Sequence, residues 1–420
     1  LGSKKGPFKA LGEVSRGDGA NGQELVYKGA NAAFLPALKN ADNLFKMLKN
    51  VVGEPFPPDL VRKAKAMGIS NEGIARRTSK EITTVNEACH QEGIYPSLVS
   101  IVNGRNFVSY DPDAGDRKAD GKVNQGFAST ILILGPGPYR IGWGPEVDIA
   151  LVQTAGTLKG KGNRIILINN NPDAVSQDSK FLDHICLEAP ILEVIESLIQ
   201  KYSVDGLIHQ FCFSLPEGLD RLLEKHGVRV LGTPLPSRAE LQDVVYLRKK
   251  MMEIGIPMFP HALVADTALA SEEAAHLGYP VLVRLTDDVL NPNTEIIYHE
   301  AGLMNFLGAY RERISEQTPL LIESYQEGLV GIKVLAIGDG EKAASVAFLE
   351  NIEEYGVHSG DCAVTIPTLS IGDFVKASIE EVIQRLVKAF NVTGHLLIDL
   401  ALKGRNFYVV SLWPFPSSTL

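Results

Sequence analysis

The stretch that decides the fold is "STILILGPGPYRIGWGPEVDIALVQTAGTLKGKG", residues 129–162. Its first seven residues form a short apolar run that ends at a glycine, which predicts a fully buried strand. A turn rich in glycine and proline follows, and residues 146–162 have the pattern of a helix. A buried strand that leads directly into a helix is typical of α/β proteins with a parallel sheet.

The alternation of strand and helix continues beyond this stretch. Strands are expected in "RIILINNN" (164–171), "DGLIHQF" (205–211) and "VRVLGT" (228–233), with helices in "ILEVIESLIQKYSV" (191–204) and "LPEGLDRLLEKHG" (215–227). Elements that alternate at this spacing indicate a parallel sheet covered on both faces. Residues 128–247 are therefore predicted to form a doubly wound α/β domain.

Three segments precede this domain. Residues 1–34 are rich in glycine and polar residues and are expected to be loop, and residues 111–127 form a polar linker. Between them, residues 35–110 are predicted to form a small helical domain, because their apolar residues recur at helical spacing. Residues 58–94 of this domain indicate three short helices, with Ser70 as a candidate cap.

The rhythm of short helices and turns in this domain allows two interpretations. A DNA-binding module would use its basic residues, which are Arg62, Lys63, Lys65, Arg76, Arg77 and Lys80. Three glutamates, Glu72, Glu81 and Glu87, interrupt that basic face, whereas phosphate contacts favour an unbroken one. A packing domain is favoured, and no nucleic-acid partner is expected.

The pattern changes again at residue 248. Strands are expected in "VLVRLTDD", "TEIIYHE", "LLIESYQ", "GIKVLAIGDG", "KAASVAFLENIEE", "LLIDLAL" and "NFYVVSLW", and helices in "EEAAHLG" and "KASIEEVIQRLVKAF". Residues 248–420 are therefore predicted to be an α+β domain built largely from antiparallel sheet.

The composition of the 420 residues is that of an ordinary globular protein, with 45% hydrophobic and 22% charged residues. A formal charge of −9 argues against a chain-wide surface for nucleic acids or anionic membranes. No apolar run reaches the roughly 18–20 residues of a membrane-spanning helix, so no membrane partner is expected. Four cysteines without metal-ligand spacing favour a soluble protein in a reducing compartment, such as the cytosol or a mitochondrial matrix.

The glycines near the first strand raise the first question of function. Gly135, Gly137, Gly142 and Gly144 lie between a strand and a helix, where backbone N–H groups can bind an anion. The pattern differs from the dinucleotide fingerprint, because the third glycine position is filled differently and prolines stiffen the turn. An anion site and a purely structural turn are both compatible with these residues.

Five motifs together resemble a known family. They are "LGPGPYRIGWGPEVD" (134–148), "INNNPDAVSQD" (168–178), "VRVLGTP" (228–234), "GYPVLVR" (278–284) and "GVHSGD" (356–361). Their order and spacing are similar to one synthetase half of the large chain of carbamoyl phosphate synthetase, namely its second, carbamate-phosphorylating half. The helices over about 45–100 resemble the oligomerisation domain that precedes that half. The resemblance implies a pre-ATP-grasp domain over 128–247, an incomplete ATP-grasp domain over 248–420, and ATP-dependent phosphorylation of carbamate.

Some positions of the family's motifs are retained. By the resemblance, Arg284 faces the nucleotide phosphates, and Gly356, Val357, His358 and Ser359 lie beside the ribose and base of a vestigial nucleotide site. Arg140, Asn171 and Pro172 keep positions of the pre-grasp motifs. For Arg284 and His358, a structural ion pair or hydrogen bond is the alternative to nucleotide contact.

Other positions of the family's pattern are lost. The flexible glycine loop that should follow Arg284 is replaced by residues 285–291 and Pro292, which contain no glycine. The acidic residue that would hold the ribose falls at Gly331. The Gly-Gly-Gln of the pre-grasp domain falls at Cys212, Phe213 and Ser214.

The metal centre implied by the resemblance is also altered. Of its three oxygen ligands only the first is acidic, at Asp399, while the glutamate becomes Ser411 and the asparagine becomes Trp413. The arginine that follows becomes Phe415. No phosphoryl transfer is expected at this site, because little remains to neutralise a transferring phosphoryl group. A replacement metal site of Asp399, Glu350 and Glu353 is one possibility, and hydrogen-bonded or exposed acids are the other.

Two interpretations of function follow. The first is a non-catalytic, carbamoyl-phosphate-synthetase-like protein with a structural, assembly or regulatory role, protein partners or a homo-oligomer, and no cofactor. Its ending "LWPFP" (412–416) would be either an apolar interaction surface or core filling. The alternative is a portion of a functional synthetase, an ATP-dependent ligase, or a protein that still binds ATP, for which ATP and Mg²⁺ would be the cofactors.

Overall fold

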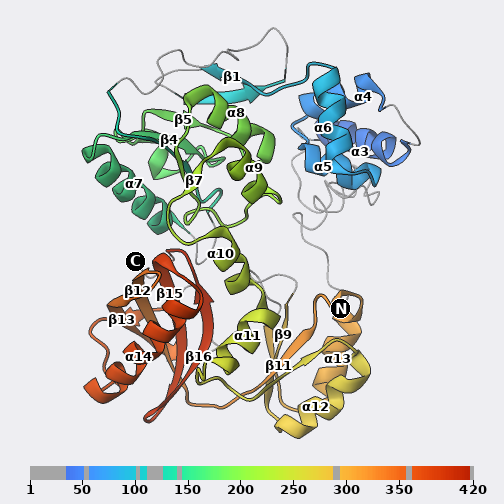
Figure 1. Ribbon diagram of the computed structural model, residues 1–420. Coiled ribbons are helices and arrows are strands. Elements are labelled where there is room, and N and C mark those ends of the chain that lie inside the picture. Colours follow the sequence, from blue (N-terminus) through green and yellow to red (C-terminus); the bar gives the residue numbers. More distant parts are fainter. Residues whose placement is uncertain are drawn as a thin grey trace.

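The computed structural model describes residues 35–51, 56–100, 105–110, 126–139, 144–286, 294–355 and 362–416. Figure 1 shows three units that follow one another along the chain: a group of helices, a sheet flanked by helices, and a unit that contains two further sheets. The predicted loop 1–34 and residues 111–125 of the predicted linker lie outside the described residues.

In the part of the chain that the structure describes, the first unit consists of four helices. They are α3 (Leu35–Lys49), α4 (Pro58–Ala66), α5 (Asn71–Thr78) and α6 (Ile82–Gln91). Each contributes a fully buried aliphatic side chain to one core, namely Leu48, Val61, Ile74 and Val85. The three short helices predicted over 58–94 are confirmed, and the Ser70 hydroxyl caps α5 by accepting the Gly73 N–H at 3.0 Å.

A seven-stranded sheet forms the second unit, in the order β1-β2-β5-β4-β3-β6-β7. Its strands are β1 (Ser97–Ser100), β2 (Arg105–Ser109), β3 (Thr130–Leu134), β4 (Arg164–Ile168), β5 (His184–Cys186), β6 (Gly206–Ile208) and β7 (Arg229–Val230). All neighbours pair in parallel except β1 and β2, which form an antiparallel pair. The predicted parallel sheet is thus confirmed.

Helices cover both faces of this sheet. They are α7 (Pro145–Gly160), α8 (Leu192–Tyr202) and α9 (Leu219–His226). Alternate residues of β3 divide between the two faces: Leu132 packs in a core with α8 and α9, and Ile133 in a core with α7. This division is the period of two that a strand imposes, and it makes the unit doubly wound as predicted.

Strands β1 and β2 correct the predicted division of the chain. The sequence assigned residues 35–110 to the helical domain, but β2 pairs in parallel with β5 through Arg105 and Asn106. The edge strands of the sheet therefore come from the segment that directly follows the helices. Such a pairing joins residues about 80 positions apart, which local periodicity cannot reveal.

The third unit contains two antiparallel sheets, entered through α10 (Leu235–Gln242) and α11 (Val244–Glu253). The smaller sheet, in the order β10-β9-β11-β8, consists of β8 (His261–Val264), β9 (Val281–Leu285), β10 (Thr294–Ile297) and β11 (Leu320–Ser324). The larger, β14-β13-β12-β15-β16, consists of β12 (Val330–Asp339), β13 (Ala343–Glu354), β14 (Val364–Thr365), β15 (Thr393–Lys403) and β16 (Asn406–Trp413). The predicted antiparallel α+β unit is confirmed.

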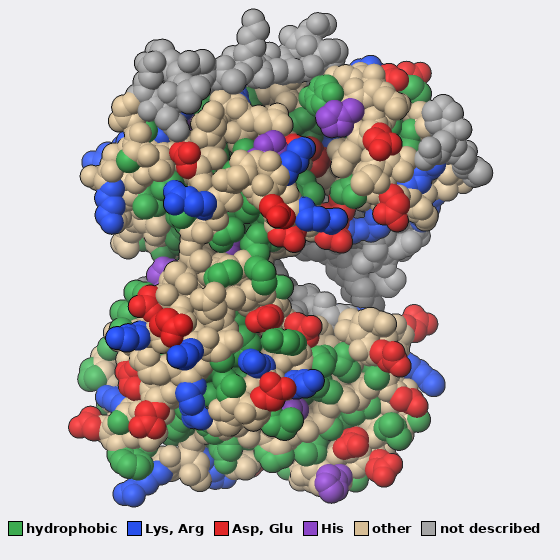
Figure 2. Space-filling view, in the orientation of Figure 1, with side chains coloured by type: hydrophobic (Ala, Val, Ile, Leu, Met, Phe, Trp, Pro, Cys, Tyr) green, Lys and Arg blue, Asp and Glu red, His purple; other side chains and the backbone are tan. Residues whose placement is uncertain are grey.

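Helices pack on each of these two sheets. The smaller sheet shares a core with α12 (Ala270–Leu277) and α13 (Glu300–Tyr310), and the larger one with α14 (Asp373–Ala389). The described residues also contain three short 3-10 turns: η2 (Val175–Asp178), η3 (Thr267–Leu269) and η4 (Arg311–Arg313). In Figure 2, acidic and basic side chains are interspersed over this unit and the two above it. Within the described ranges, no helix combines the length and hydropathy that a membrane crossing requires.

Candidate functional site

The side chains at the end of β16 surround the carboxylate of Asp399. Asp399 on β15 lies directly opposite Ser411 on β16, so both side chains project from the same face of the sheet. The Ser411 hydroxyl donates a hydrogen bond to Asp399 Oδ2 at 2.5 Å. Trp413 lies two residues further along β16 on that face, and its indole N–H points at the same oxygen from 3.0 Å.

This arrangement determines what Asp399 can bind. The indole N–H also lies 2.8 Å from Ser411 Oγ, so the three side chains form one compact cluster. Indole is a donor only, and the serine proton is already directed at the carboxylate. Two donors thus occupy positions around the carboxylate from which a cation would need oxygen ligands.

A β-bulge sets this geometry. Asp399 pairs with Ser411 and Leu400 pairs with Val409, so Val410 is an extra residue on β16. A bulge leaves the backbone of the extra residue outside the regular ladder. The Val410 carbonyl accepts a hydrogen bond at 3.2 Å from the buried Arg248 of α11.

The predicted replacement metal site of Asp399, Glu350 and Glu353 is wrong, because Asp399 and Glu350 cannot bind the same ion. Asp399 lies opposite Lys333 on β12, whereas Glu350 lies opposite the preceding residue, Ile332. Consecutive residues of a strand point to opposite faces, so the carboxylates of Asp399 and Glu350 lie on opposite faces of the sheet.

The carboxylates of Glu350 and Glu353 accept hydrogen bonds from neighbouring residues, as the alternative of hydrogen-bonded acids predicted. Glu350 accepts the backbone N–H groups of Leu369 and Ser370, each at 2.7 Å, and the Ser370 hydroxyl at 2.5 Å. Burial by itself would raise the pKa of Glu350, but these bonds outweigh it and lower that pKa below its ordinary value. The Cys362 thiol donates to Glu353 at 2.6 Å. Among the described residues, no three His, Cys, Asp or Glu side chains form a group that could hold a metal ion.

The apolar ending after Trp413 is core, which corrects the alternative of an exposed interaction surface. Phe415 is 1% exposed, and Pro414 and Pro416 are buried. The Phe415 ring lies 5.2 Å from that of Phe213 and 5.8 Å from that of Trp413, in the core that α7 shares with the sheet. The C-terminal strand therefore ends inside the second unit.

Arg238 organises the loop where the family pattern has Gly-Gly-Gln. Its guanidinium is buried and donates to the carbonyls of His209 at 2.9 Å and of Cys212 and Phe213 at 2.7 Å each. It also lies over the ring of Phe415, 5.4 Å from the centroid. These contacts hold Cys212 and Phe213 as structural residues.

His209 is neutral in this network. Burial, aided by the neighbouring Arg238, lowers the pKa of His209 to about 4. The Arg238 guanidinium donates to Nδ1 at 3.0 Å, so Nε2 carries the proton and donates to the Thr233 carbonyl at 2.8 Å.

Gln210 and Thr233 join the sheet unit to the larger antiparallel sheet. The Gln210 amide donates to the Pro414 carbonyl at 3.2 Å, and the Thr233 hydroxyl donates to the Thr393 carbonyl at 2.9 Å. An added Cβ at Gly394 would collide with Gln210, so glycine permits this close approach.

Arg284 forms part of a buried charge cluster between the two antiparallel sheets. Its Nη2 lies 3.7 Å from Glu323 Oε2, while Glu323 Oε1 lies 2.7 Å from Arg248 Nη2. Arg248 and Glu323 are almost fully buried, and burial lowers the pKa of Arg248 although Glu323 opposes that shift. The alternative of a structural ion pair therefore describes Arg284 here, and nucleotide contact stays a prediction.

The space beside this cluster is small. Residues of α10, α11, β9 and the end of β16 enclose a cavity of about 30 Å³, which has room for one or two waters. Ligand pockets for small organic molecules usually measure about 300–1,000 Å³. This cavity by itself is smaller than a nucleotide.

Steric contact with the neighbouring strand explains why position 331 is a glycine. A side chain at this position would collide with the amide of Asn351 on the neighbouring strand β13. The acidic residue expected from the family pattern therefore has no room without displacement of Asn351.

Two backbone N–H groups of the glycine-rich turn before α7 donate hydrogen bonds to side chains of the same chain. The Gly144 N–H donates to Glu146 Oε1 at 2.7 Å, which puts a carboxylate at the helix N-terminus. The Gly137 N–H, at a positive φ of 77°, donates to Asn169 Oδ1 at 3.0 Å. These bonds favour the structural turn over an anion site.

Asn171, one of the retained pre-grasp positions, also forms hydrogen bonds within the chain. Its side-chain oxygen accepts the Asp173 N–H at 3.0 Å, and its carbonyl accepts from Gln177 at 3.0 Å. Several other predicted positions lie outside the described residues: Arg140, Gly142, residues 287–293, Gly356, Val357, His358 and Ser359.

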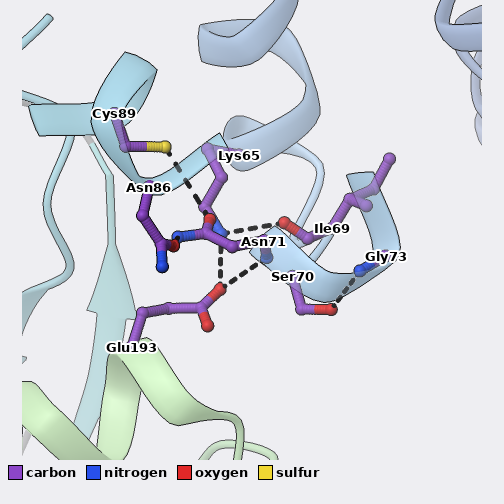
Figure 3. A network of polar contacts seen from close by, with 8 residues as sticks. All are labelled: Lys65, Ile69, Ser70, Asn71, Gly73, Asn86, Cys89 and Glu193. Carbon is purple, nitrogen blue, oxygen red and sulfur yellow. Dashed lines mark hydrogen bonds and ion pairs between the residues drawn. The ribbon is translucent and has the colours of Figure 1, made fainter. Parts of the chain in front are cut away.

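The basic residues of the helical unit are mostly engaged within the chain. Lys65 is 2% exposed and donates to Glu193 of α8 at 2.7 Å and to the Ile69 carbonyl at 2.9 Å (Figure 3). Arg76 pairs with Glu72, and Arg77 lies over the Phe45 ring at 4.0 Å. Such contacts are typical of a packing domain, and the expectation of no nucleic-acid partner stays a prediction.

Sequence reasoning missed Arg248, Glu323 and Arg238. Glu323 interrupts the apolar strand "LLIES" and Arg284 the apolar strand "VLVRL", and two opposite charges within buried strands are a signal that could have paired them. Arg248 and Arg238 stand on helices among other polar residues, where nothing in the sequence separates a buried arginine from an exposed one.

Comparisons with known proteins agree with this architecture. The family model for the carbamoyl phosphate synthase preATP-grasp domain matches residues 128–238. The carbamoyl phosphate synthase large chain of Methanothrix thermoacetophila is 31% identical over 399 residues, which cover 92% of this chain and 36% of that protein. The C-terminal section of the Aquifex aeolicus large chain is 31% identical over 69% of this chain and 54% of that protein.

This chain is a carbamoyl phosphate synthase large-chain-like protein. It spans about a third of the length of the full large chains, as the 36% coverage of the Methanothrix protein shows. Solved structures support the fold. The biotin carboxylase domain of the Hydrogenobacter thermophilus 2-oxoglutarate carboxylase covers 70% of this chain at a TM-score of 0.56 and 17% identity, with 65% of that chain covered. N5-carboxyaminoimidazole synthase of Aspergillus clavatus covers 68% at 0.53 and 14% identity, with 70% of that chain covered.

Around Asp399, the described residues differ from the Mg²⁺ ligand set that the carbamoyl phosphate synthase resemblance implies. Ser411 and Trp413 direct donors at Asp399, whereas Mg²⁺ requires oxygen ligands in near-octahedral geometry. Phe415 replaces the implied arginine and lies in the core of the sheet unit. No chemical step through Mg-ATP follows from this geometry.

Proposed function

We propose that this carbamoyl phosphate synthase-like chain does not transfer phosphoryl groups and that its ATP-grasp fold has a structural, assembly or regulatory role. The observation that carries the proposal is the cluster of Asp399, Ser411 and Trp413, in which two donors hold the lone carboxylate. Phosphoryl transfer depends on cations and donors placed around the transferring group. Both donors lie on Asp399 Oδ2, and only Oδ1 is without a hydrogen-bond partner among the described residues, so one carboxylate oxygen remains where a magnesium site needs several oxygen ligands.

The surroundings of the cluster support the proposal further. Arg284, which by the family resemblance would face the phosphates, forms an ion pair with Glu323. The adjacent cavity measures about 30 Å³. A nucleotide would have to displace the ion pair and widen the cavity. Both changes cost free energy that binding would need to offset.

Mg-ATP titration tests the proposal. A ligand that binds only the native state raises stability by RT ln(1 + [L]/Kd), so Mg-ATP is expected to leave the Tm of the whole chain unchanged. Bicarbonate-dependent release of phosphate from ATP is expected to equal that of a heat-denatured sample. A saturable rise in Tm together with turnover would overturn the proposal, and a rise without turnover would favour ATP as a structural ligand.

A second function is that of a portion of a working carbamoyl phosphate synthase, an ATP-dependent ligase. The retained Arg284 and the partial span of the full-length relatives favour it. Restoration of two ligand positions, Ser411→Glu with Trp413→Asn, tests how far the site is from activity. We expect no turnover, because Gly331 still supplies no acidic side chain for the ribose and Phe415 supplies no charge. Bicarbonate-dependent ATP hydrolysis by this double variant would favour the second function.

A further inference from the structure

Arg248 has more hydrogen-bonding capacity than its described neighbours use. Its side chain is 2% exposed, and Nη2 contacts both Glu323 Oε1 at 2.7 Å and the Val410 carbonyl at 3.2 Å. Its Nη1 is buried and has no hydrogen-bond partner within the part of the chain that the structure describes. A buried donor without an acceptor costs about 1–3 kcal/mol, and more when the group is charged.

The charges around Arg248 do not cancel. Arg248 and Arg284 carry two positive charges, and both contact the single carboxylate of Glu323. Asp399, on the neighbouring sheet, is hydrogen-bonded to Ser411 and Trp413 and is not part of these contacts. The contacting cluster of two arginines and one glutamate therefore has an excess of one positive charge in a buried place.

The small cavity lies against this excess charge. Arg248 and Arg284 both line it, together with Ser411, the indole of Trp413 and a set of aliphatic side chains: Leu241, Val244, Leu247, Leu285, Val410 and Leu412. Its volume of about 30 Å³ fits an occupant of one to a few atoms. Apolar walls with two guanidinium groups favour an occupant that carries a negative charge, because a buried charge is costly unless it is paired.

We propose that this cavity binds a small monovalent inorganic anion, such as chloride or bicarbonate, between the guanidinium groups of Arg248 and Arg284. The anion would accept from Arg248 Nη1 and neutralise the cluster. It would also join three elements that enclose the cavity, α11, β9 and β16. This inference does not depend on the absence of phosphoryl transfer, since a nucleotide is far larger than the cavity.

The test is the Tm of the whole chain at constant ionic strength while gluconate is exchanged for chloride, nitrate or bicarbonate. Wild type is expected to show a saturable rise of about 2 °C or more with the anion that fits best. Arg248→Met is expected to lose the rise, and Arg221→Met, which removes an exposed arginine of α9, is expected to keep it. An equal response of all three proteins, or no response of wild type, would overturn the proposal.

Bromide gives a second measurement that does not rely on a variant that folds. In wild-type crystals grown with bromide, an anomalous peak is expected within about 3.5 Å of Arg248 Nη1. Density without anomalous signal in the cavity would identify water as the occupant and would also overturn the proposal. The chloride and bicarbonate arms of the Tm series distinguish a halide site from an oxyanion site.

Discussion

The indole N–H of Trp413 donates a hydrogen bond to Asp399, and a substitution by phenylalanine removes this bond but keeps an aromatic ring. Trp413→Phe leaves the carboxylate with the Ser411 hydroxyl as its described donor. We expect the free energy of unfolding to fall by about 1–3 kcal/mol, because a partly buried carboxylate loses a charge-assisted hydrogen bond. Urea denaturation at neutral pH, followed by circular dichroism, measures the change.

Asp399→Asn provides the control for this bond. In a double-mutant cycle with Trp413→Phe, the two changes are expected to be less than additive, since each removes the same interaction. Strict additivity would mean that the indole stabilises the protein through packing alone, and that the cluster of Asp399, Ser411 and Trp413 is not a unit.

Sequence reasoning located this residue cluster but not its geometry. The altered positions Ser411 and Trp413 followed from the order of the motifs. Their convergence on one carboxylate oxygen depends on the register of β15 with β16 and on the bulge at Val410. Register is set by the packing of a whole sheet, so a single strand does not encode it.

At the scale of elements, the pair of Lys65 and Glu193 attaches α4 of the helical unit to α8 of the sheet unit. Glu193 Oε1 also accepts the Asn71 N–H at 3.0 Å, at the start of α5 (Figure 3). Lys65→Met is expected to cost about 3–5 kcal/mol, because it leaves a largely buried carboxylate with one described donor fewer. Chemical denaturation measures this loss.

A more exposed pair that joins α8 to α9 serves as the matched control. Lys225 lies 2.8 Å from Glu196, and its side chain is 65% exposed. Lys225→Ala is expected to change the unfolding free energy by at most about 1 kcal/mol. Similar losses for Lys65→Met and Lys225→Ala would contradict a special role of the buried pair.

Glu350 links the stability of β13 to pH. Hydrogen bonds from Ser370 and Leu369 overcome the effect of burial and lower the pKa of Glu350 in the folded state. A lowered folded pKa stabilises the protein above the unfolded pKa, about 4.3, and that stability is lost as the pH falls toward the folded pKa. The difference in urea midpoint between wild type and Glu350→Gln should therefore be largest near neutral pH and shrink below about pH 4. A constant difference from pH 6 to 3 would show that Glu350 does not titrate with unfolding.

The elements were predictable where their patterns are local. The strands β3, β4, β6 and β7 and the helices α7, α8 and α9 followed from short apolar runs and helical spacing. The three-residue strand β5 and the four-residue strand β8 were missed, because so few residues show no period. The pairing of β2 with β5 was missed since it joins the segment after the helices to a distant strand.

At the scale of the whole molecule, the C-terminal strand fastens two units to each other. Strand β16 belongs to the larger antiparallel sheet, yet Phe415 just beyond it lies in the core of the parallel sheet. Gln210 and Thr233 add hydrogen bonds across the same junction. A large apolar contact between units favours cooperative unfolding, whereas a small polar one allows the units to move and unfold separately.

Phe415→Ala tests whether this junction makes the two units unfold together. Removal of a fully buried phenylalanine is expected to cost about 3–5 kcal/mol, and the loss falls on the junction rather than on either sheet. Calorimetry of wild type should show a common transition for the two units, and Phe415→Ala should separate it into two. Phe374→Ala, at a phenylalanine that is 74% exposed at the start of α14, should change neither the number of transitions nor the stability by more than about 0.5 kcal/mol. A single transition shifted uniformly downward in Phe415→Ala would show that the hydrogen bonds of Gln210 and Thr233 are sufficient to couple the units.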